Sequence, residues 1–130
     1  MPITYVPDEA RRSVRTRVTG SVTPQDILAH YHTASEQKFL DFAELIDARE
    51  VNAPFLTTAE IWRTASLVRA FETDEPFGPR AVVVASDLMF GMARMFSNLI
   101  SDFFPMKVFR DEIEAEEWLA GQQQSLQRRG

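Results

Sequence analysis

The chain has 130 residues and a mass of 14.8 kDa, which is the size of one ordinary domain. Its 19 acidic and 14 basic side chains give a net charge of −5, which argues against a general nucleic-acid-binding protein, because such proteins present a basic face. The absence of cysteine excludes disulfides, a thiolate nucleophile and cysteine-ligated metal sites.

The sequence does not predict a leader or a membrane span. Its first residues lack the basic start and apolar stretch of a signal peptide. No apolar run approaches the ~18 residues that a bilayer-spanning helix needs. We therefore expect a cytoplasmic protein.

Two short strands open the chain. Residues 3–6 are β-prone, and the turn residues 7–9 follow them. Residues 13–19 alternate apolar and polar side chains, which predicts a strand buried on one face, and Gly20 ends it. The two strands are expected to form a hairpin.

A helix and a strand come next. Thr23 is a suitable N-cap, Pro24 suits the first helical position, and Asp26 adds favourable charge to the first turn. The apolar spacing carries this helix over residues 24–38. Residues 42–47 are predicted to form the third strand.

The second helix is marked by its start. Thr57 followed by Glu60 is a capping-box pattern, and it predicts a helix that runs to about residue 71. Turn-forming residues at 74–79 close it. Residues 80–85 follow as an apolar run without alternation, which is typical of a central strand covered on both faces.

The last third of the chain predicts a helix, a strand and a helix. Ser86 can cap a helix over residues 87–104, which Pro105 stops. Residues 106–110 form the last strand. Asp111 caps a final helix that we expect to end at Gly121, because glycine is common just after a helix.

The element order is therefore β-β-α-β-α-β-α-β-α. Alternating strands and helices predict an α/β fold, here a single domain with a mixed, mostly parallel five-stranded sheet and four flanking helices. The domain should cover residues 1–121, and residues 122–130 should be a polar, frayed tail.

Several segments resemble the SpoIIAA-like family, which has the STAS/SEC14 (CRAL-TRIO-related) fold. The segments that carry the resemblance are residues 20–23, 47–49, 80–85, 90–96, 108–111 and 114–119. The resemblance implies a regulatory binding module. Anti-sigma-factor antagonists with this fold carry a phosphorylatable serine after an aspartate near the start of the second helix. This chain has neither there, and the hydroxyls that could stand in are Thr57, Thr58 and, one helix later, Ser86.

No combination of residues predicts catalysis. His30 and His32 point ~200° apart on a helix, so they cannot hold one metal, and we expect both at the surface or its boundary. Nucleotide-binding and hydrolase motifs are missing from the sequence. Acidic residues at the start of the last helix suit its dipole. We predict no enzyme activity, no metal and no cofactor.

The helix at residues 87–104 has more apolar surface than a covering helix needs. One arc of ~120° would form its core face, and further apolar residues widen the arc to ~220°. The arc comprises Leu88, Met92, Met95, Phe96, Leu99 and Phe103, and the flanks comprise Met89, Phe90, Ala93, Ile100 and Phe104. Neighbouring helices, a homodimer interface, or a groove for an apolar ligand or membrane could each cover the flanks.

The leading hypothesis is a non-enzymatic module that acts through protein–protein contact and forms a homodimer through this helix. The alternative is a carrier or sensor of a small lipophilic ligand, neutral or acidic, with peripheral membrane contact through the arginines at residues 11–17. Arg49 or Arg94 would hold the ligand's polar head. The apolar side chains expected to line the groove are Met89, Phe90, Phe96, Ile100 and Phe104.

A further candidate site lies at the carboxyl ends of the strands, where open α/β sheets bind ligands. Helix N-termini at this rim would favour an anion, although capping of loops is the simpler role for these side chains. The residues expected at the rim are Asp47, Arg49, Thr57, Thr58, Ser86, Asp87, Arg110 and Asp111.

Overall fold

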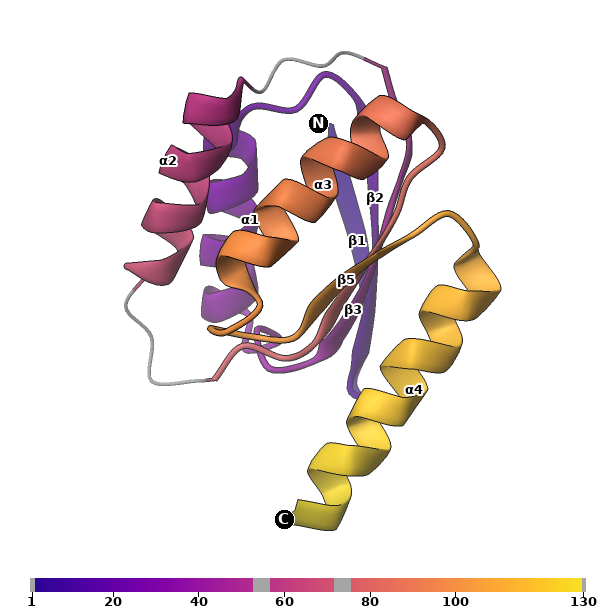
Figure 1. The fold of residues 1–130 in the computed structure, drawn as a ribbon. Coiled ribbons are helices and arrows are strands. Elements are labelled where there is room, and N and C mark those ends of the chain that lie inside the picture. Colours follow the sequence, from indigo (N-terminus) through magenta and orange to yellow (C-terminus); the bar gives the residue numbers. More distant parts are fainter. Residues whose placement is uncertain (1, 53–56, 72–75, 130) are drawn as a thin grey trace.

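The computed structural model describes residues 2–52, 57–71 and 76–129, with side chains up to residue 125. Its element order is the predicted one (Figure 1). The elements are β1 (Ile3–Asp8), β2 (Ser13–Gly20), α1 (Pro24–Glu36), β3 (Ala43–Val51), α2 (Thr58–Arg69), β4 (Arg80–Val83), α3 (Asp87–Ile100), β5 (Met106–Phe109) and α4 (Glu112–Arg129).

The five strands form one sheet in the order β1-β2-β3-β4-β5. β1 and β2 pair antiparallel as the predicted hairpin, and every later pair is parallel. This confirms a mixed, mostly parallel five-stranded sheet with four helices.

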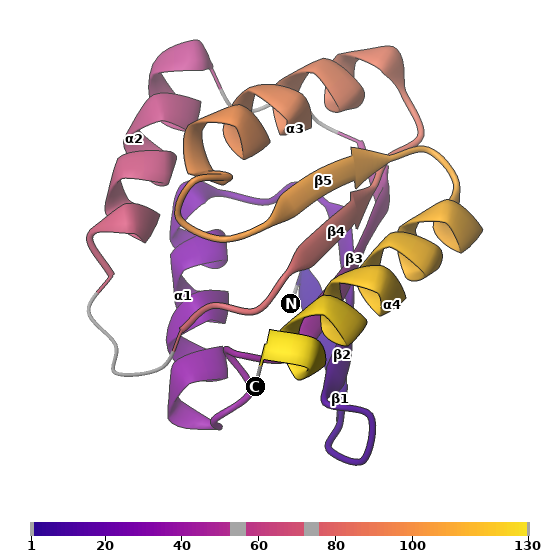
Figure 2. The same ribbon diagram turned by 60° about the horizontal axis from the view of Figure 1, so that its bottom comes forward.

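The strand order explains where the helices lie. Each parallel crossover moves one strand further in the same direction, and right-handed crossovers then put their helices on one face. α1, α2 and α3 accordingly share one face, while α4, which follows the last strand, packs on β3, β4 and β5 from the other (Figure 2). α2 packs against α1 and α3 (Figure 1).

The core follows the same division. All four residues of β4 are buried, which confirms that it is a central strand. On the α4 side, Ala115 and Leu119 pack with alternate residues of β3, β4 and β5. On the opposite side, two clusters of apolar side chains fill the space between the sheet and the three helices.

Side-chain caps start the helices as the sequence predicts. Thr23 accepts the N–H of Asp26 at 3.1 Å, and Thr57 accepts the N–H of Glu60 at 3.2 Å, each with the reciprocal bond of a capping box. Asp111 accepts the N–H of Ile113 at 2.8 Å. Each cap satisfies backbone donors that a helix start leaves free.

Several predicted boundaries are wrong. β1 continues through Asp8, because proline is tolerated on an edge strand. β3 runs four residues beyond position 47 to Val51, since it keeps pairing with β2 past an irregularity in the register. α3 ends at Ile100 rather than residue 104, where Phe103 and Phe104 both donate to the Ile100 carbonyl. Residues 74 and 75 of the predicted turn lie outside the described residues.

The end of α4 is the largest error. The helix continues through Gly121 to Arg129, so the predicted frayed tail is helical. Glycine ends helices when it adopts a left-handed conformation, and Gly121 does not adopt one. Within the described residues, none of the helices is both long and apolar enough to cross a bilayer.

Two glycines should respond oppositely to replacement by alanine. A Cβ on Gly78 would collide with the backbone carbonyls of Asp41 and Phe42, whereas a Cβ on Gly91, inside α3, would meet open space. We expect Gly78→Ala to lower the free energy of unfolding and Gly91→Ala to raise it by up to about 1 kcal/mol through better helix propensity. Urea unfolding of both variants measures the difference, and a tolerated Gly78→Ala would contradict the close approach.

Candidate functional site

The orientation of α3 differs from the predicted one. Met89, Phe90 and Ala93, expected on the flanks, pack toward the sheet, whereas Leu88 at the expected centre is 56% exposed. A helical wheel finds the middle of an apolar arc, but α3 is covered from two directions, by β5 and by α2. Neighbouring elements therefore bury Ile100 and Phe104 and partly cover Met89, Phe90 and Ala93, which favours the first of the three explanations open from the sequence.

An apolar cavity of about 150 Å³ lies between the sheet and the three helices. Strands β1 to β5 form its floor, and α1, α2 and α3 form its walls. The lining residues are Ile3, Val18, Val22, Ile27, Tyr31, Ile46, Ala48, Val51, Ile61, Thr64, Val82, Met89, Met92, Ala93, Phe96 and Met106.

The lining offers no charge to a ligand. Only Tyr31 and Thr64 among these residues carry a polar side-chain atom. The Thr64 hydroxyl donates to the Glu60 carbonyl of its own helix at 2.7 Å. Burial raises the pKa of Tyr31 to about 12, so its phenol stays neutral. A lining of this kind favours apolar ligands over charged ones.

Only part of the predicted ligand site comes together at this cavity. Met89 and Phe96 line it. Phe90 instead lies beneath the guanidinium groups of Arg110 and Arg94, at 4.6 and 5.9 Å from its ring centre. Ile100 and Phe104 belong to a neighbouring apolar cluster, at the α1 side of the core.

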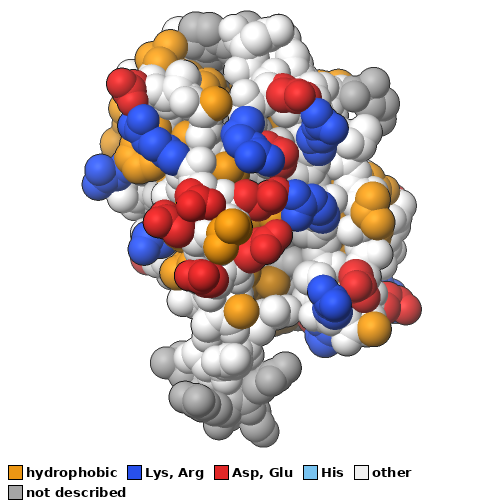
Figure 3. All heavy atoms as spheres, turned by 90° about the vertical axis from the view of Figure 1, so that its right-hand side faces the viewer, with side chains coloured by type: hydrophobic (Ala, Val, Ile, Leu, Met, Phe, Trp, Pro, Cys, Tyr) orange, Lys and Arg blue, Asp and Glu red, His pale blue; other side chains and the backbone are white. Residues whose placement is uncertain are grey.

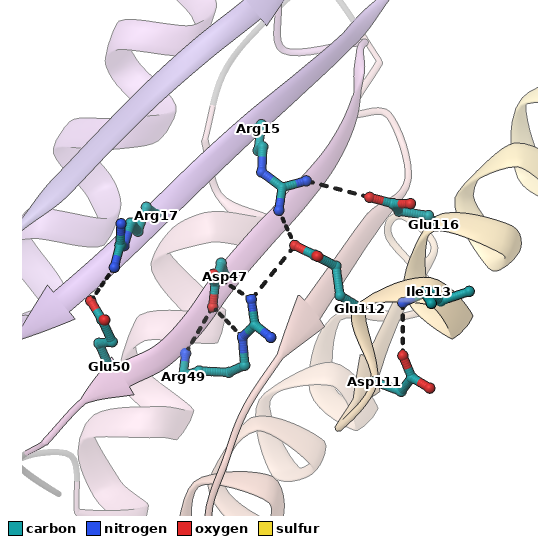
Figure 4. Close-up of polar contacts among 9 residues, drawn as sticks. All are labelled: Arg15, Arg17, Asp47, Arg49, Glu50, Asp111, Glu112, Ile113 and Glu116. Carbon is teal, nitrogen blue, oxygen red and sulfur yellow. Dashed lines mark hydrogen bonds and ion pairs between the residues drawn. The ribbon is translucent and has the colours of Figure 1, made fainter.

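Arg49 does not reach the cavity. Its guanidinium pairs with Asp47 at 2.9 Å and with Glu112 of α4 at 3.6 Å, which places it on the opposite face of the sheet (Figure 4). The hydrogen bond to Arg49 lowers the pKa of Asp47 despite partial burial, which acts in the other direction. The prediction that Arg49 holds the polar head of a ligand in the groove is therefore wrong. Side chains of β3 alternate between the two faces of the sheet, and that of Arg49 lies on the α4 face.

The same face carries the arginines of the hairpin. Arg15 contacts Glu112 and Glu116, and Arg17 pairs with Glu50 at 2.5 Å (Figure 4). Acidic and basic side chains are consequently interspersed over this side of the molecule (Figure 3). The basic hairpin predicted from the sequence is thus largely neutralised by carboxylates.

A buried ion pair lies at the start of the two central strands. Glu44 of β3 and Arg80 of β4 are partners in the register, and each side chain is 1% exposed. Arg80 Nε lies 3.2 Å from Glu44 Oε1. The other nitrogens of Arg80 donate to the carbonyls of Gly78 and Leu40. The rings of Tyr31, Phe77 and Phe104 surround the guanidinium at 5.2–5.6 Å.

The second oxygen of Glu44 binds the rest of the cluster. Oε2 accepts the Thr16 hydroxyl and lies 2.6 Å from His30 Nε2. Burial alone would raise the pKa of Glu44, but His30, Arg80 and Thr16 outweigh it and lower the pKa from 4.5 to about 2. The carboxylate is therefore ionised at neutral pH.

His30 corrects a prediction. Its side chain is 9% exposed and faces Glu44, not solvent. The sequence interpretation missed this cluster, although a signal was present. Glu44 and Arg80 are charged residues that stand among apolar residues near the starts of two neighbouring strands, and opposite charges on buried strands are expected to pair.

Most other rim residues serve as caps or ion pairs. Ser86 caps α3 by accepting the N–H of Met89 at 3.1 Å, and Arg110 pairs with Asp87 at 2.6 Å. Thr57 caps α2, and Thr58 is exposed beside it. Phosphorylation of Thr57, Thr58 or Ser86 stays a prediction. Within the described ranges, no three acidic or histidine side chains are grouped to hold a metal ion.

A family model described as SpoIIAA-like matches residues 13–120. The match begins with β2 and ends within α4. No curated protein and no solved structure matches the chain significantly.

Arg80→Met should leave the buried Glu44 carboxylate without its charged partner. We expect the free energy of unfolding to fall by about 3–5 kcal/mol, because breaking a buried pair leaves a charge without compensation. Glu44→Gln/Arg80→Met should lose less than the two single variants together. Arg17→Met, which breaks an exposed pair, is the control and should cost less than about 1 kcal/mol. Urea unfolding compares these four variants, the single Glu44→Gln included, with the wild type, and an Arg80→Met as mild as the control would refute the expectation.

Stability should also fall in acid because of Glu44. The unfolded carboxyl takes up a proton near pH 4.5 and the folded one near pH 2, so the unfolded chain binds more protons between these values. The contribution of Glu44 is complete above the upper value and lost as the pH falls toward the lower one. The unfolding free energy of Glu44→Gln should therefore decline less steeply over this range than that of the wild type. Parallel declines would show that Glu44 does not titrate in this way.

Proposed function

The chain belongs to the SpoIIAA-like family, and from this premise we propose that it is a non-enzymatic regulatory module that binds a small, neutral, apolar molecule. The observation that carries the proposal is the cavity beneath α2, whose lining is almost wholly apolar. The SEC14-type resemblance of the sequence supports the same ligand class.

The position of the cavity suits a sensor. Its lining comes from all five strands and from three helices, so an occupant contacts most of the fold at once. Ile61 and Thr64 bring α2 into that lining. Because α2 packs on α1 and α3, filling the cavity would bias how α2 sits on the domain. A protein partner that binds the exposed side of α2 would then respond to the presence of the ligand.

A neutral ligand fits better than the acidic one considered from the sequence. No charged residue lines the cavity, and burying an unpaired carboxylate would be costly. Arg49 lies on the other face of the sheet, and Arg94 is exposed over Phe90. Hydrocarbons and small aromatic molecules are therefore the favoured class.

Protein–protein contact at the surface of α2 and α3 is a second candidate function. A hollow of about 510 Å³ lies between the first turns of these helices. Leu88 at this hollow and Trp62 on α2 are both exposed apolar side chains, which is typical of docking surfaces. A homodimer through this surface stays a prediction.

Filling the cavity should abolish ligand binding. Toluene, naphthalene and hexane should raise the melting temperature of the wild type, by on the order of 10 °C at about 100 times Kd, whereas hexanoate should not. Ala93→Leu places extra methyl groups in the cavity and should remove the response. Ala59→Leu adds the same volume at an exposed position of α2 and should keep it. Thermal unfolding followed by circular dichroism measures the shifts. No shift with any neutral compound, or an equal shift in Ala93→Leu, would overturn the proposal.

A further inference from the structure

The two edges of the sheet are protected to different degrees. β1 and β5 lie at opposite edges (Figure 2). β5 has only four residues and carries the exposed Lys107, and both features keep an edge strand from pairing with another chain. β1 has six residues, no charged side chain before Asp8, and an apolar side chain, Val6, that is 71% exposed. The β1 edge is therefore more open to an added strand.

The hydrogen-bond pattern of β1 determines which backbone groups face its outer edge. Thr19 donates its N–H to the Pro2 carbonyl at 2.9 Å, and Ile3 stands opposite Val18 in the register. Opposite residues in an antiparallel pair alternate between bonded and non-bonded positions. Positions 2, 4, 6 and 8 therefore bond to β2, whereas positions 3, 5 and 7 direct their backbone groups away from it.

The outer edge of β1 offers a short run of donors and acceptors. Ile3 and Tyr5 each supply an N–H and a carbonyl, and in the described part of the chain no further strand pairs with them. Pro7 supplies a carbonyl but no N–H, so it ends the run of donors. Donors and acceptors at alternate residues match one kind of partner, the backbone of an extended chain.

A small hollow of about 90 Å³ lies between this edge and α1. Ile3 and Tyr5 of β1 and Asp26 and His30 of α1 contribute to its lining. Sites for ordinary small ligands measure about 300–1,000 Å³, so the hollow is too small for such a ligand but can accept one side chain. A strand added to β1 would point every second side chain toward it, because residues opposite each other share a face of the sheet.

The charge of the hollow favours a basic side chain. Asp26 is the only acidic residue in its lining, and no lysine or arginine is among the described residues that form it. The Asp26 carboxylate accepts the N–H of Thr23 at 2.9 Å through one oxygen. His30 is turned to Glu44, 2.6 Å away. The net charge of −5 also attracts a basic segment at longer range.

We propose that the β1 edge binds an extended, basic segment of a partner protein, which joins the sheet as an antiparallel sixth strand. The residues opposite Ile3 and Tyr5 would exchange N–H and carbonyl bonds with them and point their side chains to the α1 side. At least one of these residues would be lysine or arginine, whose charge would meet Asp26. The residue between them would lie on the other face and cover Val6.

A second copy of β1 fits this edge less well than a basic segment does. β1 contains neither lysine nor arginine, so a second copy would bring no counter-charge to Asp26. It would also add its own Asp8 to an acidic surface. Charge complementarity therefore favours a different chain as the occupant.

Methylated peptides test the strand pairing directly. The probe is a fluorescein-labelled hexapeptide that alternates lysine and valine. In the proposed arrangement the lysine N–H groups face β1 and the valine N–H groups face solvent. N-methylation of the lysine amides should raise Kd at least about tenfold, and N-methylation of the valine amides should leave it within about twofold. Fluorescence anisotropy measures Kd, and equal effects of the two methylations would overturn the proposal.

A matched pair of variants tests the charge. Asp26→Asn removes the charge in the hollow, and Asp87→Asn removes one from the first turn of α3. Asp26→Asn should raise the Kd of the lysine–valine peptide about threefold to tenfold, and Asp87→Asn should leave it unchanged. A glutamate–valine hexapeptide should not bind. Equal Kd values for the two variants, or equal binding of the two peptides, would overturn the basic partner. Circular dichroism checks that both variants keep their fold.

Amide NMR locates the bound peptide. The N–H resonances of Ile3 and Tyr5 should shift most on titration, and those of Met106 and Val108 at the β5 edge should not. Shifts confined to β5, or no binding of the peptide up to about 1 mM, would overturn the proposal. A wild-type dimer whose Ile3 and Tyr5 amides are already protected from exchange would also overturn it and assign the edge to a second copy. Hydrocarbon binding in the cavity is measured separately, so either result leaves the proposed function to its own test.

Discussion

The ion pair between Glu44 and Arg80 is the constraint on which most of the fold depends. It joins the two central strands at their first paired position, and each partner is buried too deeply to be solvated by water. Every remaining polar atom of the pair must therefore find its contacts within the protein. Glu44 draws Thr16 of β2 and His30 of α1 to it, while Arg80 holds the carbonyls of Leu40 and Gly78.

One charged cluster thereby fixes the register of three strands, the rotation of α1 and the chain entering β4. A shift of one residue in either central strand would move a charge to the α4 face and leave its partner alone. The aromatic rings around Arg80 add favourable contacts with its guanidinium. Loss of either partner is costly because it leaves a buried charge alone, even though an intact buried pair often contributes little net stability.

The uneven distribution of helices shapes both faces of the sheet. Three helices must fit on one face of a five-stranded sheet, so α2 packs on α1 and α3, and an apolar cavity remains among them. The other face has α4 alone, which leaves β1 and β2 beside an open hollow. Both features follow from a strand order that advances in one direction.

The sequence by itself determined the elements, their order, the fold class and the caps at Thr23 and Thr57, because periodicity and capping are local properties of the chain. It did not determine the rotation of α3, the partner of Arg49, the burial of His30 or the continuation of α4 past Gly121. These four features depend on which segments of the chain pack against one another across the sheet. Contacts between residues far apart in the chain are set by packing, and only the tertiary structure could decide them.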